Sequence, residues 1–235
     1  MLKKICPLLA MMALVACGTV TTQQPLSDVE KASKSSFLTD YSLLRPGVEG
    51  QARLRYINRD VDWKSYKSIF IEPVVFINDA HAKPDPKEQQ ILTSYYYNTL
   101  KTHLSTVLPI VDIQGPNVLV LRAALTNVTG EEPGLRTISV IIPQARLLNA
   151  VQSLGSDTYA FVGSAQSEGE FLDGATGKIL AEGVDGRSGG ISVENAGGGK
   201  WSDAEHAMDY WAALTTKRLS DFRSGNFNST AAPAQ

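Results

Sequence analysis

The chain of 235 residues lacks several features that would point to particular classes of protein. Its 22 Lys and Arg residues do not exceed its 24 Asp and Glu residues, so the basic surplus typical of nucleic-acid binding is absent. Two cysteines, Cys6 and Cys17, are too few for a disulfide framework. The N-terminal apolar run, Ile5–Val15, is much shorter than the roughly 20 residues of a membrane-spanning helix. With 43% hydrophobic and 20% charged residues, the composition is that of a globular protein.

The N-terminus has the organisation of a bacterial export signal. Lys3 and Lys4 form a cationic start, the apolar run follows, and Ala16 is a small residue before a cleavage point. The sequence Leu14-Val15-Ala16-Cys17 matches the bacterial lipobox. We therefore expect residues 1–16 to be removed as a lipoprotein signal peptide and Cys17, the nucleophile as a thiolate, to be lipidated. The alternative is an ordinary secretory signal that ends near a cysteine.

Lipid on Cys17 would attach the chain to a membrane. Each buried methylene contributes about 0.8 kcal/mol, so one acyl chain binds reversibly, whereas two or three chains give stable attachment. Gly18 occupies the position at which aspartate would direct retention in the inner membrane of enteric-type bacteria. We therefore predict an outer-membrane lipoprotein that faces the periplasm, with the lipid as its contact with the membrane.

The mature chain is expected to form one domain between two flexible ends. Residues 17–35 are rich in Thr, Gln, Ser and Lys and are interpreted as a flexible tether. Residues 226–235 are small and polar and are interpreted as a disordered tail. Residues 36–225 fall within the size range of a single domain.

Strand signals dominate this domain. Residues 68–77 are β-branched and aromatic, with Glu72-Pro73 indicating an edge position or a bulge. Residues 118–128 are apolar enough for a central strand. Residues 159–172 and 178–186 predict a hairpin, because the turn-forming sequence Asp-Gly-Ala-Thr-Gly lies between them.

Two long helices are also predicted. Asp85-Pro86-Lys87-Glu88 is typical of a capped helix start, and apolar residues at helical spacing continue to Leu108-Pro109. Ser202 and Glu205 predict a second capping box, before a helix that ends at Gly225. Runs of strands with few helices favour an α+β fold: a mainly antiparallel sheet with the two helices packed on one face.

Three segments of the domain resemble a known family. They are residues 36–42 (SFLTDYS), 66–74 (YKSIFIEPV) and 170–178 (EFLDGATGK). Together with the lipobox, they resemble a family of bacterial lipoproteins catalogued as domain of unknown function 3313. The resemblance supports the envelope location and the fold, and it implies no catalytic or binding residue.

Motifs for metal or nucleotide binding are not apparent. His81, His103 and His206 are far apart in the sequence, so no metal site is predicted. The run Gly197-Gly198-Gly199-Lys200 lies before a helix, but Trp201 stands where a phosphate-binding loop needs Ser or Thr. We therefore expect no cofactor.

Two pairs of carboxylates stand close together in the sequence. Glu131-Glu132 precedes a Pro-Gly turn, and Glu168 and Glu170 alternate along a predicted strand, so that both face the same side. The simplest interpretation places that side in solvent, whereas glycoside cleavage would need a groove between two carboxylates.

Tyr95, Tyr96 and Tyr97 are consecutive on the first predicted helix. Successive residues spread around a helix, so at least one of these rings must face sideways or outward. Tyrosine is enriched at protein interfaces, and the three residues are a possible partner surface; packing between helix and sheet is the alternative.

These observations predict a lipid-anchored envelope protein with a non-catalytic binding or assembly role. The expected partner is an envelope protein or a cell-wall component. The alternative is a lipid-anchored hydrolase that acts on cell-wall or lipid material. A deep pocket with converging titratable side chains would favour the enzyme.

Overall fold

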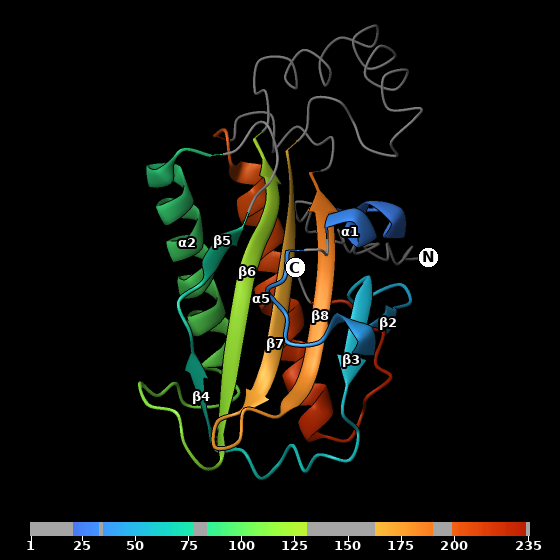
Figure 1. The fold of residues 1–235 in the computed structure, drawn as a ribbon, viewed down its shortest axis with the longest axis vertical. Coiled ribbons are helices and arrows are strands. Elements are labelled where there is room, and N and C mark those ends of the chain that lie inside the picture. Colours follow the sequence, from blue (N-terminus) through green and yellow to red (C-terminus); the bar gives the residue numbers. More distant parts are fainter. Residues whose placement is uncertain (1–20, 33–34, 78–83, 131–162, 190–198, 234–235) are drawn as a thin grey trace, which may run out of the picture.

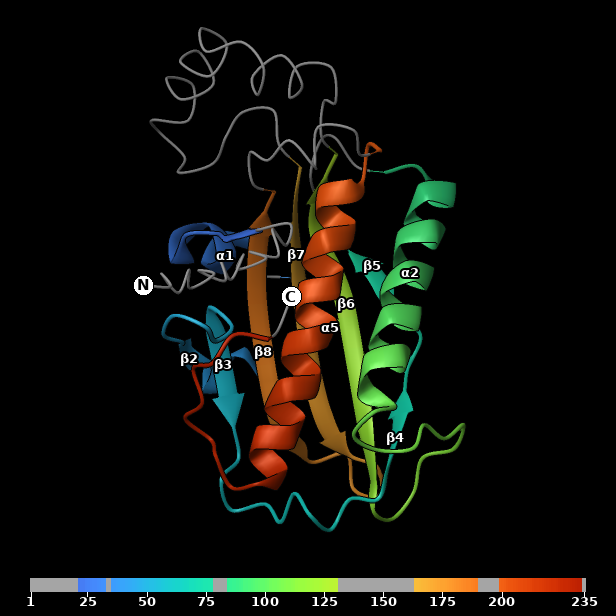
Figure 2. The ribbon, with the colours of Figure 1, turned by 180° about the vertical axis from the view of Figure 1, so that it is seen from behind.

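The computed structural model describes residues 21–32, 35–77, 84–130, 163–189 and 199–233 (Figure 1). These residues form one mixed sheet of eight strands, and two long helices cover one of its faces (Figure 2). The α+β fold expected from the sequence is therefore confirmed. Among the described helices, none combines the length and apolar content that crossing a membrane requires.

Three long antiparallel strands form the middle of the sheet. They are β6 (Val118–Thr129), β7 (Ser164–Asp173) and β8 (Ile179–Ser188). The turn between β7 and β8 confirms the predicted hairpin. On the far side of β8, β3 (Leu54–Ile57) and then β2 (Arg45–Pro46) continue the sheet in antiparallel pairing.

The opposite edge is parallel and interrupted. β4 (Ser68–Ile71) and β5 (Val75–Ile77) both pair with β6 in parallel. Pro73 lies in the gap between them and has no N–H to donate to a strand ladder, so the predicted strand over residues 68–77 is two short edge strands.

The first long helix, α2 (Pro86–Leu104), begins as predicted. The Asp85 carboxylate accepts a hydrogen bond from the Glu88 amide at 2.9 Å, and the Glu88 carboxylate accepts one from the Asp85 amide at 3.0 Å. This reciprocal capping box satisfies two amides that the helix leaves free.

The second long helix, α5 (Ser202–Arg223), begins differently from the prediction. Trp201 is the N-cap and makes no side-chain cap, so the capping box expected from Ser202 and Glu205 is wrong. The Trp201 indole donates instead to the Glu88 carboxylate at 3.1 Å, which fixes the chain beside α2 where α5 starts. Gly225 follows the helix with φ of 81°, the left-handed conformation expected of its stop signal.

The main core lies between the two long helices and the sheet. α5 contributes one apolar face, and α2 and the sheet supply the rest. Its buried residues include Trp63, Tyr96, Leu100, Leu119, Leu125, Met208, Trp211 and Phe222.

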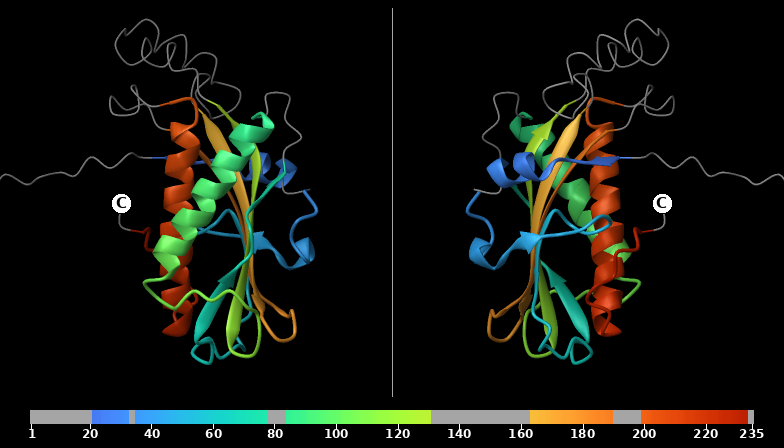
Figure 3. Two further views of the ribbon diagram at one scale, coloured as in Figure 1. Left: turned by 90° about the vertical axis from the view of Figure 1, so that its left-hand side faces the viewer. Right: turned by 90° about the vertical axis from the view of Figure 1, so that its right-hand side faces the viewer.

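A smaller core lies on the other face of the sheet. The short helix α1 (Leu26–Ala32) and the turn η1 (Tyr41–Leu43) lie on this side, opposite α2 and α5 (Figure 3). Val29 and Leu38 from this N-terminal segment are buried against Leu54 and Val184 of the sheet.

Part of the expected tether is therefore packed against the domain. β1 (Thr22–Gln23) pairs with the end of β8, and the Gln24 side chain donates to the Arg187 carbonyl at 3.1 Å. Although residues 21–32 are largely polar, these main-chain and amide bonds and the burial of Val29 hold them on the sheet.

Candidate functional site

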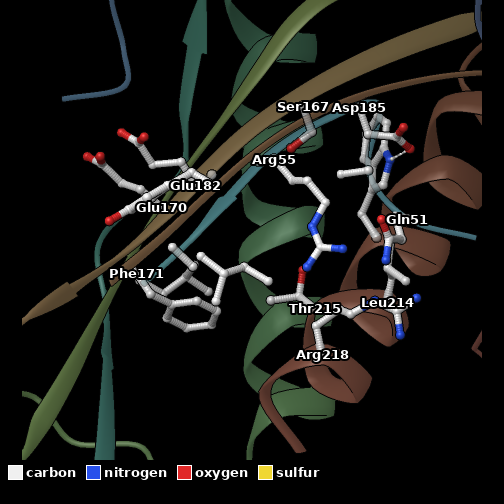
Figure 4. A pocket seen from close by; sticks show the side chains of 18 of the residues that line it. Gln51, Arg55, Ser167, Glu170, Phe171, Glu182, Asp185, Leu214, Thr215 and Arg218 are labelled. Carbon is white, nitrogen blue, oxygen red and sulfur yellow. Dashed lines mark hydrogen bonds between the residues drawn. The ribbon is translucent and has the colours of Figure 1, made fainter. Parts of the chain in front are cut away.

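A cavity of about 130 Å³ lies between α5 and the sheet (Figure 4). Ser167 and Phe171 of β7 and Asp185 of β8 face it, because alternate residues of a strand point to the same side. The neighbouring residues Glu170 and Glu182 point away from α5 to the opposite face.

Two paired glycines create the space. Gly169 of β7 and Gly183 of β8 are directly opposite each other, both on the helix side of the sheet. A Cβ on Gly183 would meet its nearest atom, the Ala52 Cβ, at 3.7 Å, and a Cβ on Gly169 would meet the Arg122 carbonyl at 3.5 Å. Both positions therefore have room for a methyl group, and the missing side chains leave the cavity unfilled.

One end of the cavity is polar, and its polar groups are bonded within the protein. The Tyr96 and Ser167 hydroxyls are 3.1 Å apart. The Trp211 indole donates to Asp185 Oδ2 at 2.9 Å, and the Gln23 amide donates to Asp185 Oδ1 at 2.6 Å. Burial raises the pKa of Asp185 above its ordinary value, against these hydrogen bonds.

The rest of the wall is apolar until the mouth. Leu214 and Phe222 of α5 face Phe171 and Ile57 of the sheet. The Trp63 ring lies 5.0 Å from the Phe222 ring and 6.2 Å from the Phe171 ring, centre to centre, and closes this side. An apolar group inside the cavity would be surrounded by apolar atoms.

The mouth carries two guanidinium groups, Arg55 of β3 and Arg218 of α5 (Figure 4). Burial lowers the pKa of Arg55, and the nearby positive charges of Arg218 and Arg59 lower it further. The sequence carries no signal for these arginines as a site, because strand pairing and helix packing bring them together from positions far apart in the chain.

The C-terminal segment contacts several residues of the mouth. Phe227, within the expected disordered tail, stacks on Phe222 at 6.0 Å, and its carbonyl accepts from Arg55 at 2.9 Å. The Ser229 carbonyl accepts from the Gln51 amide at 3.1 Å. The described part of residues 226–235 is thus packed on the domain, because the mouth supplies hydrogen-bond donors that its main chain accepts.

A second polar cluster occupies the other face of the sheet. Glu168, Glu170 and Glu182 are at most 4% exposed. The interpretation of Glu168 and Glu170 as solvent-facing is therefore wrong, although they do share one side. Residues 35–44 cover them, and these residues contain many hydrogen-bond donors.

Each glutamate has its own partners. Glu168 accepts from the Ser35 hydroxyl at 2.9 Å and from the Tyr41 hydroxyl. Glu170 accepts from the Thr39 amide and hydroxyl, each at 3.1 Å, and pairs with Arg122. Glu182 accepts from the Asp40 amide at 3.1 Å.

Burial changes the acidity of this cluster. It raises the pKa of Glu168, against the hydrogen bonds from Tyr41 and Ser35. It raises the pKa of Glu182 to about 7, with a further contribution from the negative charge of Glu170. At neutral pH, Glu182 is therefore protonated in part of the molecules and charged in the others.

The three tyrosines occupy three environments. Tyr96 is buried in the main core at 3% exposure. The Tyr95 hydroxyl donates to the Asp209 carboxylate of α5 at 2.9 Å, and Tyr97 is half-buried against the core. Packing between helices and sheet accounts for Tyr96 and for the contact of Tyr95, and a partner role for the group stays a prediction.

Ser188 is the central residue of a Gly-x-Ser-x-Gly sequence at positions 186–190, the pattern of a serine-hydrolase nucleophile. That pattern needs a sharp turn between strand and helix, whereas Ser188 is the last residue of β8, paired with Thr22. Its neighbour Arg187 stacks on Tyr210 of α5 at 3.6 Å, so Ser188 faces the opposite side of the sheet, away from His206.

The other residues singled out in the sequence either lie outside the described residues or make ordinary contacts. Cys17, His81 and Glu131-Glu132 lie outside the described residues. Lys200 pairs with Glu88 at 3.0 Å. Within the described part of the chain, no three His, Cys, Asp or Glu side chains are placed to hold a metal ion.

Fold and cavity together define an α+β domain with a partly open cavity between a helix and the sheet. The chain belongs to the family described as "Protein of unknown function (DUF3313)", whose model matches residues 33–215, and the resemblance noted in the sequence is confirmed. A curated relative, the "Uncharacterized lipoprotein YdcL" of Escherichia coli (strain K12), is 27% identical over 187 residues, which cover 74% of this chain and 77% of the relative. The protein of the same name from Escherichia coli O157:H7 matches equally.

Solved structures show only distant likeness. A PelC dodecamer from Paraburkholderia phytofirmans is 14% identical with a TM-score of 0.36, over 77% of this chain and 94% of that chain. A putative neuraminyllactose-binding hemagglutinin homolog from Helicobacter pylori is 11% identical with a TM-score of 0.38, over 80% of this chain and 97% of that chain.

Proposed function

We propose that this chain is a lipoprotein of the bacterial outer membrane, anchored through Cys17, whose periplasmic domain has a non-catalytic binding role. The lipobox at Leu14–Cys17 supports the anchor, and so does the similarity to a protein named as a lipoprotein. The family match covers most of the folded domain.

The cavity under α5 is the observation that carries the binding role. Its apolar walls and few polar groups have the composition of a small-molecule site. The polar side chains at its inner end, Ser167 and Asp185, are bonded to Tyr96, Trp211 and Gln23. These bonds hold the wall in place and leave the groups poorly suited to act as nucleophile or base.

The anchor would hold the domain close to the lipid. Only four positions separate Cys17 from Thr21, which is 4% exposed beside β8. A fully extended chain of this length reaches about 14 Å. Thr21 would therefore stay within this distance of the lipid, and the domain attached to it would remain near the membrane, where its effective concentration for envelope partners is high.

Site-specific photo-crosslinking in intact cells tests the binding role. A diazirine analogue at Leu214 would report the cavity, and benzoylphenylalanine at Tyr97 would report the tyrosine surface, where we propose that an envelope protein or cell-wall polymer binds. The matched control is the same pair of probes at Thr102, an exposed position on α2. We expect a defined adduct at Leu214 and none at Thr102.

The hydrolase alternative has a separate test. Turnover of a cell-wall or lipid substrate by the purified chain, abolished by one polar substitution in the domain, would replace the binding role. Absence of an adduct at both Leu214 and Tyr97 would contradict that role even if no turnover were found.

A further inference from the structure

The mouth of the cavity concentrates positive charge. Arg55 on β3, Arg59 just after β3 and Arg218 on α5 are close enough for the charges of Arg59 and Arg218 to act on Arg55. Lys217 is next to Arg218 on α5. Asp221 accepts from both Lys217 and Arg218, each at 3.0 Å, so one carboxylate serves two cations there.

The C-terminal segment meets these cations with neutral oxygens. Arg55 donates to the Phe227 carbonyl at 2.9 Å, and Arg59 donates to the side-chain oxygen of Asn228 at 2.8 Å. Arg218 donates to the Ser229 hydroxyl and to the Ala231 carbonyl, both at 3.1 Å. Hydrogen bonds from a guanidinium to a carboxylate or phosphate are roughly twice as strong as neutral ones, so an anion would satisfy these groups better.

The main chain of the C-terminal segment packs closely against Gly50. Gly50 has φ of 79°, and a Cβ there would meet the Thr230 carbonyl at 1.9 Å. The segment therefore lies against the domain at Gly50 and in front of the apolar cavity. It contacts Gln51, Arg55 and Arg218 at the mouth, and none of its residues lines the space between Gly183 and Leu214.

On the basis of the proposed binding role, we propose that this cavity takes a small amphiphilic anion. Its apolar part fills the space beside Gly169 and Gly183, and its carboxylate or phosphate binds Arg55 and Arg218 in place of the C-terminal segment. An apolar protein cavity of about 150 Å³ accommodates benzene, so the 130 Å³ here suits an apolar group of about six carbon atoms.

Tight binding requires both the apolar group and the anionic head of this ligand. The apolar walls favour a hydrocarbon group, because its transfer out of water stabilises the complex in proportion to its area. The guanidinium groups favour a negative head and repel a positive one. A neutral alcohol would gain the first contribution without the second, and acetate would gain the second without the first.

Isothermal titration calorimetry on the full chain in lipid nanodiscs tests the ligand class. The probes are hexanoate, hexyl phosphate, hexan-1-ol, hexylammonium and acetate. We expect hexanoate or hexyl phosphate to bind at least roughly tenfold more tightly than hexan-1-ol, because a charge-assisted pair replaces a neutral hydrogen bond. Hexyl phosphate has one more alkyl carbon than hexanoate, so a difference larger than the roughly fourfold effect of one buried methylene identifies the preferred head group.

Variants of the mouth provide the control. Arg55→Gln should weaken the binding of the anions about tenfold and leave hexan-1-ol unchanged. Arg45→Gln removes the same charge from an exposed site that donates only to the carbonyls of its own turn, and should change neither. Deletion of residues 228–235 should tighten anion binding several-fold, because it removes the neutral oxygens of Ser229 and Ala231 that Arg218 contacts.

Each outcome decides the inference. Equal binding of hexan-1-ol and hexanoate, or loss of affinity in Arg45→Gln as large as in Arg55→Gln, would overturn the anion class. Failure of every anion to bind would also overturn it. An adduct at Leu214 in cells would still uphold the binding role in each case. If Arg55→Gln does not fold, Gly183→Ala serves instead, since its methyl group should weaken anion binding by partly filling the cavity.

Discussion

Glu170 of β7 and Glu182 of β8 are directly opposite partners in the sheet, and residues 35–44 bury both. Like charges at directly opposed positions are destabilising. The partners are unequal: Glu170 is paired with Arg122 and bonded to Thr39, whereas Glu182 accepts one main-chain hydrogen bond from Asp40. The proton that relieves the repulsion therefore belongs on Glu182.

This arrangement predicts that the domain is more stable in mild acid than at alkaline pH. The pKa of Glu182 is raised to about 7 and that of Glu168 is raised in the same direction, so the folded state binds protons more tightly than the unfolded state. The resulting stability is complete below the unfolded pKa of about 4.3 and is lost as pH rises through the folded value. Urea unfolding at pH 5.5 and 8 should show a lower free energy of unfolding at pH 8.

Glu182→Gln should reduce this pH dependence. The amide oxygen keeps the hydrogen bond from the Asp40 amide, and the variant has no charge to bury at pH 8. Glu49→Gln, at an exposed position, is the matched control and should follow the wild type. A wild-type free energy of unfolding that increases between pH 5.5 and 8 would contradict the assignment.

Tyr41 is expected to hold the covering segment in place. Its hydroxyl accepts from the Phe37 amide at 3.0 Å and from the Leu38 amide at 3.3 Å, and it donates to Glu168. Tyr41→Phe removes these three hydrogen bonds, at a cost of about 1–3 kcal/mol. Ser35 still contacts the Phe37 amide and Glu168 in the variant, whereas the Leu38 amide loses this acceptor.

Hydrogen exchange locates the effect of Tyr41→Phe. The amides of Phe37 and Leu38 should exchange faster, while the amides of α2 and α5 keep their protection until global unfolding. Tyr97→Phe, on the other side of the sheet, should change neither segment. Uniform loss of protection across the sheet would indicate that the segment is not a separate unit.

The parts of the fold that the sequence predicted depend on local interactions. Asp85 and Glu88 cap α2 over one turn, Gly225 ends α5 through its own φ, and the β7–β8 turn is closed by the Asp173 side chain. Each of these signals is complete within a few residues. The start of α5 differs from the predicted capping box because Trp201 is held by Glu88, which lies more than a hundred positions earlier in the chain.

The cavity and the glutamate cluster depend on contacts between segments that are far apart in the chain, and the sequence does not indicate these contacts. Glu168 and Glu170 alternate as a solvent-facing strand would, and only the fold brings the donors of residues 35–44 over them. Gly169 was a usable signal, because glycine inside a strand often marks close approach or missing packing. The location of the cavity still required its pairing with Gly183.

Two glycines of β8 predict opposite responses to alanine. Gly183 faces the cavity, where a Cβ meets nothing closer than 3.7 Å, so Gly183→Ala should be neutral or stabilise by about 0.5–1 kcal/mol through a less flexible unfolded chain. Gly186 faces α1, where a Cβ would meet the Gln24 side-chain oxygen at 2.5 Å and Val29 at 3.0 Å. Gly186→Ala should destabilise by about 1–3 kcal/mol, because the N-terminal segment must move.

Urea unfolding of the two variants measures this difference directly. They share the strand, the substitution and the change in β propensity, so each is the control for the other. Equal destabilisation by Gly183→Ala and Gly186→Ala would mean that the space beside Gly183 is not available. It would also remove the basis for a ligand in that space.

Cys17→Ser tests the anchor. Without the thiol no lipid can be attached, and a precursor that is neither lipidated nor cleaved should accumulate, since acylation uses the cysteine sulfur. Mass measurement of the natural protein should show an N-terminal cysteine carrying acyl chains, and cell fractionation should place it with the outer membrane. Cys6→Ser, which changes the cysteine expected to leave with the signal, is the control and should be processed normally. An unmodified Cys17 in the natural protein, with a start at another residue, would contradict the lipid anchor and the membrane location. The proposed ligand of the cavity does not depend on the anchor and would still be tested by its own experiments.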